Sequence, residues 1–157
     1  DQMAMMYSEE NHYTIIDFST METSNIPYPS EWKFKLIDSG IHRTLNNQDY
    51  RQTATDDIKQ AHVVSENNRV RQSINATNVA LGMMLNETHE SLKRIGVSTN
   101  EMDHLVQTIQ QTKGVLGARM MGGGFGGMIL VLVEDENTLP HLDLISPSRP
   151  GFVEEGL

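Results

Sequence analysis

The stretch that decides the fold is VLGARMMGGGFGGMILVLV, residues 115–133. Two apolar segments, 115–121 and 128–133, are short enough for buried strands and too short to span a bilayer. Between them lie Gly122, Gly123, Gly124, Phe125, Gly126 and Gly127, five glycines in six positions. Because each glycine costs about 0.5–1 kcal/mol relative to alanine in regular structure, such a run indicates positive φ angles or close backbone packing. We therefore predict a hairpin whose tip is this glycine loop.

The glycine loop matches the pattern G-x-G-x-x-G at Gly122, Gly124 and Gly127. A dinucleotide-binding fold requires a helix directly after that pattern, and here a strand follows, which excludes that interpretation. Two interpretations stay open. The loop is a tight hairpin with close interstrand packing, or it supports a ligand, with Phe125 as the aromatic anchor of the loop.

Three helices are expected before the hairpin. The first runs from Asp56 to about Ile74, with an apolar side formed by three residues: Val63, Val70 and Ile74. The second covers 79–93 with Asn78 as its cap, and its apolar face consists of Leu81, Leu85 and Leu92. The third begins at a capping box of Ser98 and Glu101, continues with Met102, Leu105, Val106 and Ile109, and stops at Lys113-Gly114.

The first third of the chain is predicted to contain a short helix near Met3–Tyr7 and strands at 12–18 and 32–37, with a loop at Pro27–Ser30. In the second strand Lys33 and Lys35 alternate with apolar residues, so that both lysines are expected on a face exposed to water. Strands, then helices, then a strand hairpin define an α+β fold with helices packed on an antiparallel sheet.

The composition excludes several classes of function. The 157 residues carry a net charge of -9 without any cluster of basic residues, which argues against a nucleic-acid partner. No apolar run approaches the length of a membrane span, and no secretory signal opens the chain, so no membrane partner is expected. Cysteine is absent and no zinc-type histidine spacing occurs, so no metal-binding residue is assigned. His89 is expected at the surface or at the edge of the core rather than in catalysis.

Several segments occur together in one order, and this order resembles the C-terminal part of galactokinases, of the GHMP small-molecule kinase superfamily. The segments are Asp1-Gln2, the strand ending in Ile15-Ile16-Asp17, Ser39–Leu45, Tyr50, His89–Leu92, Glu101–Val106 and Gly117–Gly127. The resemblance covers roughly residues 1–133. It implies one domain, 1–135, that corresponds to the C-terminal half of a GHMP kinase and is incomplete relative to the family, with an irregular tail over 136–157.

The resemblance implies a cytoplasmic sugar 1-kinase that transfers the γ-phosphoryl group of ATP to D-galactose, with Mg²⁺ as cofactor. Asp1 takes the place of the family's carboxylate beside the sugar C1 hydroxyl, and Tyr50 takes the place of a sugar-contacting tyrosine. Residues Gly122–Gly127, including Phe125, correspond to a motif that lies near the phosphate loop and the substrate. Phe125 favours galactokinase over mevalonate kinase. The main phosphate loop does not occur in this chain, so the missing N-terminal half is an implied partner and the isolated chain is expected to be inactive.

Two alternatives remain at this stage. The chain could belong to a non-catalytic, galactokinase-like protein that binds a sugar or a regulatory partner, or to another GHMP kinase such as mevalonate kinase. In each case, apolar surface that would face the missing half is expected to be exposed to water.

Overall fold

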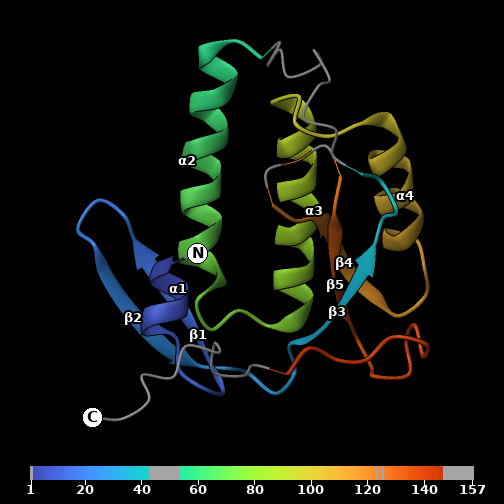
Figure 1. The fold of residues 1–157 in the computed structure, drawn as a ribbon, viewed down its shortest axis with the longest axis horizontal. Coiled ribbons are helices and arrows are strands. Elements are labelled where there is room, and N and C mark those ends of the chain that lie inside the picture. Colours follow the sequence, from blue (N-terminus) through green and yellow to red (C-terminus); the bar gives the residue numbers. More distant parts are fainter. Residues whose placement is uncertain (1, 43–53, 123, 125, 147–157) are drawn as a thin grey trace. The chain divides into compact units, whose positions relative to one another are not determined.

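The computed structural model describes residues 2–42, 54–122, 124 and 126–146 (Figure 1). The chain divides into two compact units: one comprises Asp1–Ser30 with Ile145–Leu157, and the other comprises Glu31–Leu144. Among the helices described, none is both long and apolar enough to cross a membrane.

The first unit contains a helix, α1 (Gln2–Tyr7), and a hairpin of β1 (His12–Asp17) and β2 (Glu22–Pro27). The predicted helix and the strand at 12–18 are confirmed, whereas β2 was missed because ETSNIP carries almost no apolar pattern. Cross-strand pairing holds β2 in place instead: Thr14 lies opposite Asn25, and the Thr14 hydroxyl donates a 2.6 Å hydrogen bond to the Asn25 side chain.

A three-stranded antiparallel sheet forms the framework of the second unit. Its strands are β3 (Lys33–Asp38), β5 (Met128–Val133) and β4 (Val115–Met120), in the order β3-β5-β4. β5 is therefore the central strand, and β4 and β3 are the edges. The predicted hairpin of two strands around the glycine loop is confirmed, as is the α+β class with helices packed on an antiparallel sheet.

One face of this sheet carries the main hydrophobic core. Register places Ile129 beside both Ile37 and Met120, and places Val131 beside Ala118. Helical side chains pack against this face, and the buried cluster comprises Leu92, Met102, Val106, Ile109, Ala118, Met120, Ile129, Val131 and Val133. The period-2 alternation of β5 and the helical spacing of residues 102–109 thus meet in one core.

The three helices of this unit are α2 (Asp56–Ser73), α3 (Asn78–Arg94) and α4 (Asn100–Gln110). Their extents agree with the prediction, but two of the predicted caps are wrong. Thr77 caps α3 by accepting from the Ala80 N–H, and Thr99 caps α4 by accepting from the Met102 N–H. A threonine one residue from the predicted cap offers the same hydroxyl chemistry, so the sequence pattern could not distinguish the two positions.

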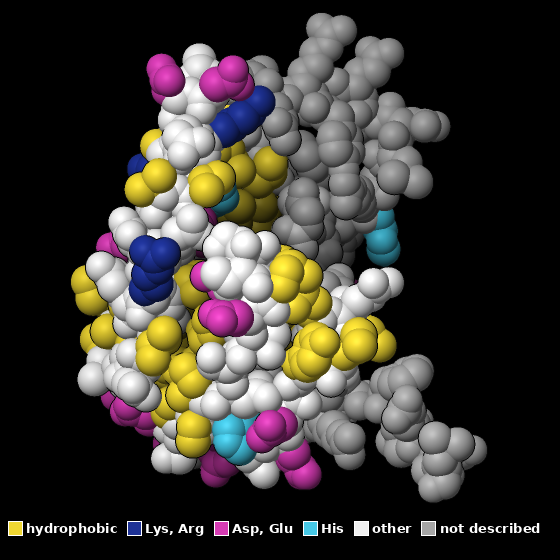
Figure 2. Space-filling model, turned by 90° about the vertical axis from the view of Figure 1, so that its left-hand side faces the viewer, with side chains coloured by type: hydrophobic (Ala, Val, Ile, Leu, Met, Phe, Trp, Pro, Cys, Tyr) yellow, Lys and Arg dark blue, Asp and Glu magenta, His cyan; other side chains and the backbone are white. Residues whose placement is uncertain are grey.

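The apolar residues expected along one side of the α2 helix are not buried. Val63, Val70 and Ile74 are all exposed, and no residue of α2 is buried. Figure 2 shows hydrophobic side chains scattered among charged and polar ones on the face that it presents. The apolar surface that the resemblance implies toward the missing half stays a prediction.

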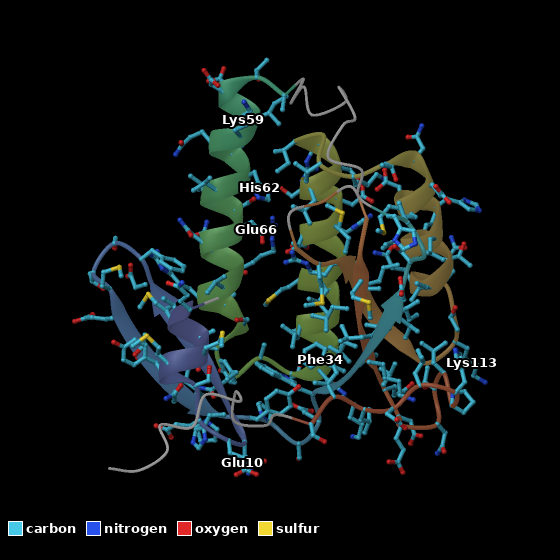
Figure 3. The ribbon with its side chains drawn as sticks, in the orientation of Figure 1. Glu10, Phe34, Lys59, His62, Glu66 and Lys113 are labelled. Carbon is cyan, nitrogen blue, oxygen red and sulfur yellow. The ribbon has the colours of Figure 1, made fainter. Side chains whose placement is uncertain are left out.

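Polar groups attach α2 to α3, which run side by side (Figure 1). His62 Nδ1 lies 2.8 Å from the Ser91 hydroxyl, and the Thr88 hydroxyl donates to the Glu66 carboxylate at 3.0 Å. Arg69 of α2 donates to Glu66 on its own helix at 2.6 Å and forms an ion pair with Glu87 of α3 at 3.6 Å. Figure 3 shows His62 and Glu66 on the side of α2 that faces α3. Hydrogen bonds and one ion pair therefore connect these two helices, whereas most helix pairs are held together by packing of an apolar stripe.

Lys35 does not lie on a face exposed to water, as the alternation in its strand predicted. Its register partner is Val131 on the core face, and the residue is only 1% exposed. Its ammonium group donates to the carbonyl oxygens of Glu136, Thr138 and Leu139 at 2.6–2.9 Å. The three donors of one ammonium thus satisfy three backbone acceptors in the segment that follows β5.

Replacing Lys35 by methionine keeps the length of the side chain and removes all three hydrogen bonds. We expect Lys35→Met to lower the free energy of unfolding by about 2–4 kcal/mol, because three carbonyl groups lose their donor. Lys33→Met, two residues earlier in the same strand, is the matched control and should change stability by less than about 1 kcal/mol. Urea denaturation measures both. Equal losses for the two variants would show that the ammonium of Lys35 has no special role.

Candidate functional site

The glycine loop connects β4 to β5 and is closed at its base by backbone hydrogen bonds. The Met121 N–H donates to the Met128 carbonyl at 2.9 Å. At the other end Gly127 donates to the Ile41 carbonyl and accepts from the Ser39 N–H, both at 3.1 Å. The segment after β3 is therefore bound to the end of the loop, which brings residues 39–42 beside residues 121–128.

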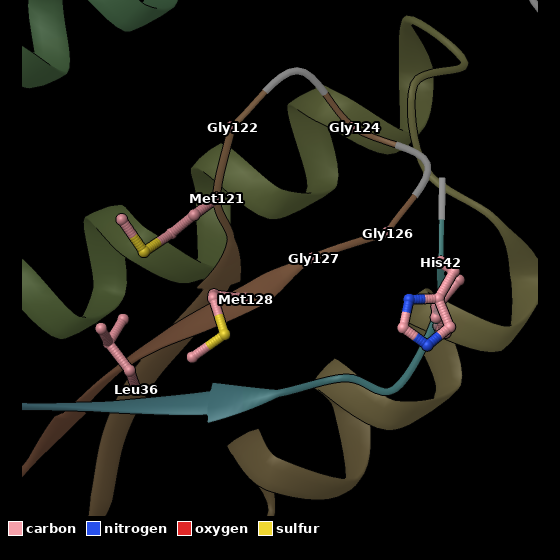
Figure 4. A pocket seen from close by; sticks show the side chains of 9 residues that line it. Leu36, His42, Met121, Gly122, Gly124, Gly126, Gly127 and Met128 are labelled. Carbon is pink, nitrogen blue, oxygen red and sulfur yellow. The ribbon is translucent and has the colours of Figure 1, made fainter. Parts of the chain in front are cut away.

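A hollow of about 500 Å³ lies between this segment and the loop (Figure 4). Its walls are mostly apolar side chains and glycine backbone: Leu36, Ile41, His42, Met121, Gly122, Gly124, Gly126, Gly127 and Met128. Among the described residues that line the hollow, His42 is the one with an ionisable side chain. The hollow therefore offers an imidazole and a strip of backbone to a small molecule, within walls that exclude part of its water.

The glycines of the loop differ in the space around their Cα atoms. At Gly124 (φ +88°) a Cβ atom would overlap the carbonyl oxygen of Val97 and lie 3.0 Å from the Val97 Cβ. At Gly122 (φ +75°) a Cβ would meet no atom within 4 Å. Gly124 is thus packed against the α3–α4 connection, while Gly122 presents its backbone to open space at the hollow.

The edge of β4 is covered by side chains from α3 and α4. Asn86 accepts from the Ala118 N–H at 2.9 Å, and Gln110 donates to the Ala118 carbonyl at 3.0 Å. The backbones of α3 and β4 almost touch, since a Cβ on Gly117 would lie 2.6–2.7 Å from atoms of Gly82. This close approach lets short side chains of α3 reach the backbone of the strand.

His89 completes the cover of that edge and is 1% exposed, so the expectation of a residue at the surface or edge of the core is wrong. Its Nδ1 accepts from the Met120 N–H at 3.4 Å, and its Nε2 lies 3.1 Å from Asp103 Oδ1. A carboxylate oxygen accepts and a backbone N–H donates, so these partners define the neutral tautomer with its proton on Nε2. The same Asp103 oxygen accepts from the Ser98 hydroxyl at 2.6 Å.

Burial lowers the pKa of His89 below its ordinary value of 6.5, and the opposing attraction of Asp103 does not restore it. Glu90 on α3 also raises the pKa, and Lys93 on the same helix lowers it. The imidazole is therefore neutral at physiological pH, which keeps its Nδ1 lone pair available to Met120.

The position of His89 along α3 is itself a sequence signal for its burial. His89 follows Leu81 by eight residues and precedes Leu92 by three, so it lies on the same helical stripe as the buried leucines. A polar side chain on an apolar stripe needs a partner inside the core, and Asp103 supplies it.

The other predicted site residues stand as follows. Asp1, Tyr50, Gly123 and Phe125 lie outside the described residues, so their shared hollow with the glycine loop stays a prediction. Gly122, Gly124, Gly126 and Gly127 line the hollow together. Within the described ranges, no three His, Asp or Glu side chains come together as ligands for a metal ion.

Comparison with known proteins shows which protein family this chain resembles. Residues 72–141, which contain α3, α4 and the glycine hairpin, match the family model "GHMP kinases C terminal". Through this region the chain is similar to the C-terminal domain of GHMP kinases. Among curated proteins it is similar to the galactokinases of Thermotoga neapolitana and Thermotoga maritima, each 30% identical over 84% of this chain. The chain spans about half the length of these relatives, 47% in both cases.

Solved structures share the fold. A Lactococcus lactis galactokinase in complex with galactose aligns over 89% of this chain and 47% of its own, with a TM-score of 0.62 and 22% identity. An L. major mevalonate kinase in complex with R-mevalonate aligns over 82% of this chain and 42% of its own, with the same TM-score and 19% identity. The sequence-based resemblance to galactokinases of the GHMP superfamily is thus confirmed, and the fold is common to both kinds of kinase.

The packing of Gly124 against Val97 can be tested by adding one methyl group. Gly122→Ala should cost about 1–2 kcal/mol, because an L-residue is strained at positive φ even in open space. Gly124→Ala adds an overlap with backbone and should cost about 3 kcal/mol or more. Thermal or urea unfolding measures both variants. If Gly122→Ala were the more damaging of the two, the assignment of Gly124 as the packed position would be wrong.

The lowered pKa of His89 predicts a pH dependence of stability. Between the folded-state pKa and the ordinary value of 6.5, the unfolded chain binds the extra proton and the folded chain does not. The free energy of unfolding should therefore fall as pH is lowered through about 6.5, and this loss should level off below the folded-state pKa.

Urea denaturation between pH of about 7.5 and about 5 tests this, with His89→Asn compared with the wild type. The slope of stability against pH should flatten in His89→Asn. His104→Asn, at an exposed position on α4, is the control and should keep the wild-type slope. Parallel slopes for all three proteins would contradict the prediction.

Proposed function

We propose that this chain is the C-terminal part of a kinase that transfers the γ-phosphoryl group of ATP to the C1 hydroxyl of galactose. The observation that carries the proposal is the glycine loop between β4 and β5, which lines a hollow at the place in the sequence where the resemblance to galactokinases is most specific. The similarity to curated galactokinases over 84% of the chain supports the same reading. A cytoplasmic location is part of the proposal.

The chemistry requires mostly positioning and stabilisation of charge. The acceptor hydroxyl loses its proton to a carboxylate, its oxygen attacks the γ-phosphorus, and ADP leaves with the electrons of the broken P–O bond. By resemblance, Asp1 is the carboxylate and Tyr50 contacts the sugar. Gly122 supports this reading because its Cα faces open space at the hollow, so substrate atoms can approach the backbone closely.

The described residues offer a place for a phosphoryl group of ATP but no ligands for Mg²⁺. The glycine strip with its neighbouring His42 is compatible with an anionic phosphoryl group beside it. Mg²⁺ would neutralise phosphate charge when it accompanies the nucleotide. We assign no residue of the described chain as its ligand, and the residues that hold the nucleotide belong to the part that completes the kinase.

A second candidate is a GHMP kinase with a different acceptor. The hollow is walled by Leu36, Ile41, Met121 and Met128, and apolar walls favour a less polar substrate than a hexose. The similarity in fold to mevalonate kinases supports this alternative equally well. A panel with galactose, other hexoses and mevalonate distinguishes the candidates, since the true acceptor should have the highest kcat/KM.

The proposed reaction is tested with a complete kinase. The chain is expressed with any coding sequence that precedes Asp1, or fused to the preceding part of the T. maritima galactokinase, and galactose-dependent release of ADP is measured. Turnover should require galactose, and Asp1→Asn should lower kcat by about 10²–10⁴-fold because the proton acceptor is lost. The 157-residue chain alone should release no ADP above background.

Two results would each contradict one part of the proposal. An unchanged kcat in Asp1→Asn would remove that residue from its role. Binding of galactose by the complete protein without any release of ADP would favour the non-catalytic, sugar-binding alternative.

A further inference from the structure

We propose that His89 is a positioning residue for the glycine loop: with Asp103 and Ser98 it ties the start of the loop to the wall on which Gly124 rests. The effect on phosphoryl transfer rests on the proposed function. The effect on the conformation of the loop does not depend on that function, and it can be measured separately.

The first attachment is at the root of the loop. Met120 is the last residue of β4, and its N–H points away from β5, on the side where β4 forms the edge of its sheet. His89 Nδ1 is the acceptor for this group, at 3.4 Å. The loop begins at the next residue, Met121, so the hydrogen bond fixes the last peptide before the chain turns toward Gly122.

The second attachment is at the middle of the loop. Gly124 packs against Val97, and the residue after Val97 is Ser98, whose hydroxyl donates to Asp103 Oδ1 at 2.6 Å. The same carboxylate oxygen lies 3.1 Å from His89 Nε2. One oxygen atom of α4 therefore holds both the imidazole that supports Met120 and the turn that supports Gly124.

The far end of the loop is anchored independently. Gly127 exchanges hydrogen bonds with the backbone of Ser39 and Ile41, which belong to the segment after β3. His89 therefore acts on one side of the hollow only. Loss of its support should loosen Met120, Gly122 and Gly124 while leaving Gly127 and the central strand β5 in place.

Two amide side chains separate the two hydrogen bonds of His89. Asparagine places an oxygen close to the position of Nδ1, so His89→Asn keeps an acceptor for Met120 and loses the contact with Asp103. Glutamine places its amide close to the position of Nε2, so His89→Gln keeps a donor for Asp103 and loses the acceptor for Met120. Each variant replaces the imidazole by a polar side chain able to make one of its two bonds, and His104→Asn is the exposed control on α4.

Amide hydrogen exchange on the full chain reads out the position of the loop. In His89→Gln the Met120 and Gly122 amides should exchange about tenfold faster relative to Ile129 and Val131 of β5. In His89→Asn the Met120 amide should stay within about twofold of wild type, while Gly124 should exchange faster because Ser98 and Asp103 lose their third partner. His104→Asn should change none of these ratios.

Kinetics on the complete kinase add the functional readout. His89→Gln should lower kcat for phosphoryl transfer by about tenfold or more and leave KM for the sugar within about twofold, because the loop is displaced and the sugar contacts are not. A uniform loss of stability would leave both constants unchanged below the unfolding temperature, so this split identifies positioning.

The outcomes separate the two proposals. If exchange at Met120 and Gly122 rises no more in His89→Gln than in His104→Asn, or rises equally at Ile129 and Val131, His89 is an ordinary core residue and the inference is wrong. If the exchange pattern appears but the wild-type complete protein transfers no phosphoryl group, the positioning role stands and the proposed function fails.

Discussion

The outer edge of β4 carries backbone N–H and C=O groups that its own sheet cannot pair, and the arrangement around it depends on satisfying them. Side chains of α3 and α4 do so: Asn86 and His89 accept from the strand, and Gln110 donates to it. These side chains are short, so the helix must lie very close. The contact between Gly82 and Gly117 permits that approach, because neither position has space for a Cβ atom.

The need to pair the backbone groups at the edge of β4 also affects the candidate site. The glycine loop leaves β4 at the last peptide that the helices hold, and it rests on Val97 in the connection between those helices. His89 thus holds Met120 at the start of the loop, and Val97 lies against Gly124 within it. At Gly122 and Gly124, glycine supplies backbone that can be approached closely.

Much of this fold could be predicted from the sequence, and the errors share one cause. The helices, the glycine hairpin and the buried strand at 128–133 follow from local periodicity and turn chemistry, which act over neighbouring residues. Burial was predicted wrongly from residue type at three places: Lys35, the valines of α2 and His89. Lys35 is buried because three carbonyl groups from residues about a hundred positions away converge on its ammonium, and no local pattern contains that information.

The sequence by itself determined that a nearly side-chain-free turn joins two apolar strands, and that this turn occurs in the order of segments found in GHMP kinases. Only the tertiary structure decided which glycine is packed and which faces the hollow, because that depends on whether Val97 lies beside it. It also decided that one oxygen of Asp103 receives both His89 and Ser98. Such convergence is a property of distance in space, since residues 89, 98 and 103 come together only when α3 and α4 pack against the edge of β4.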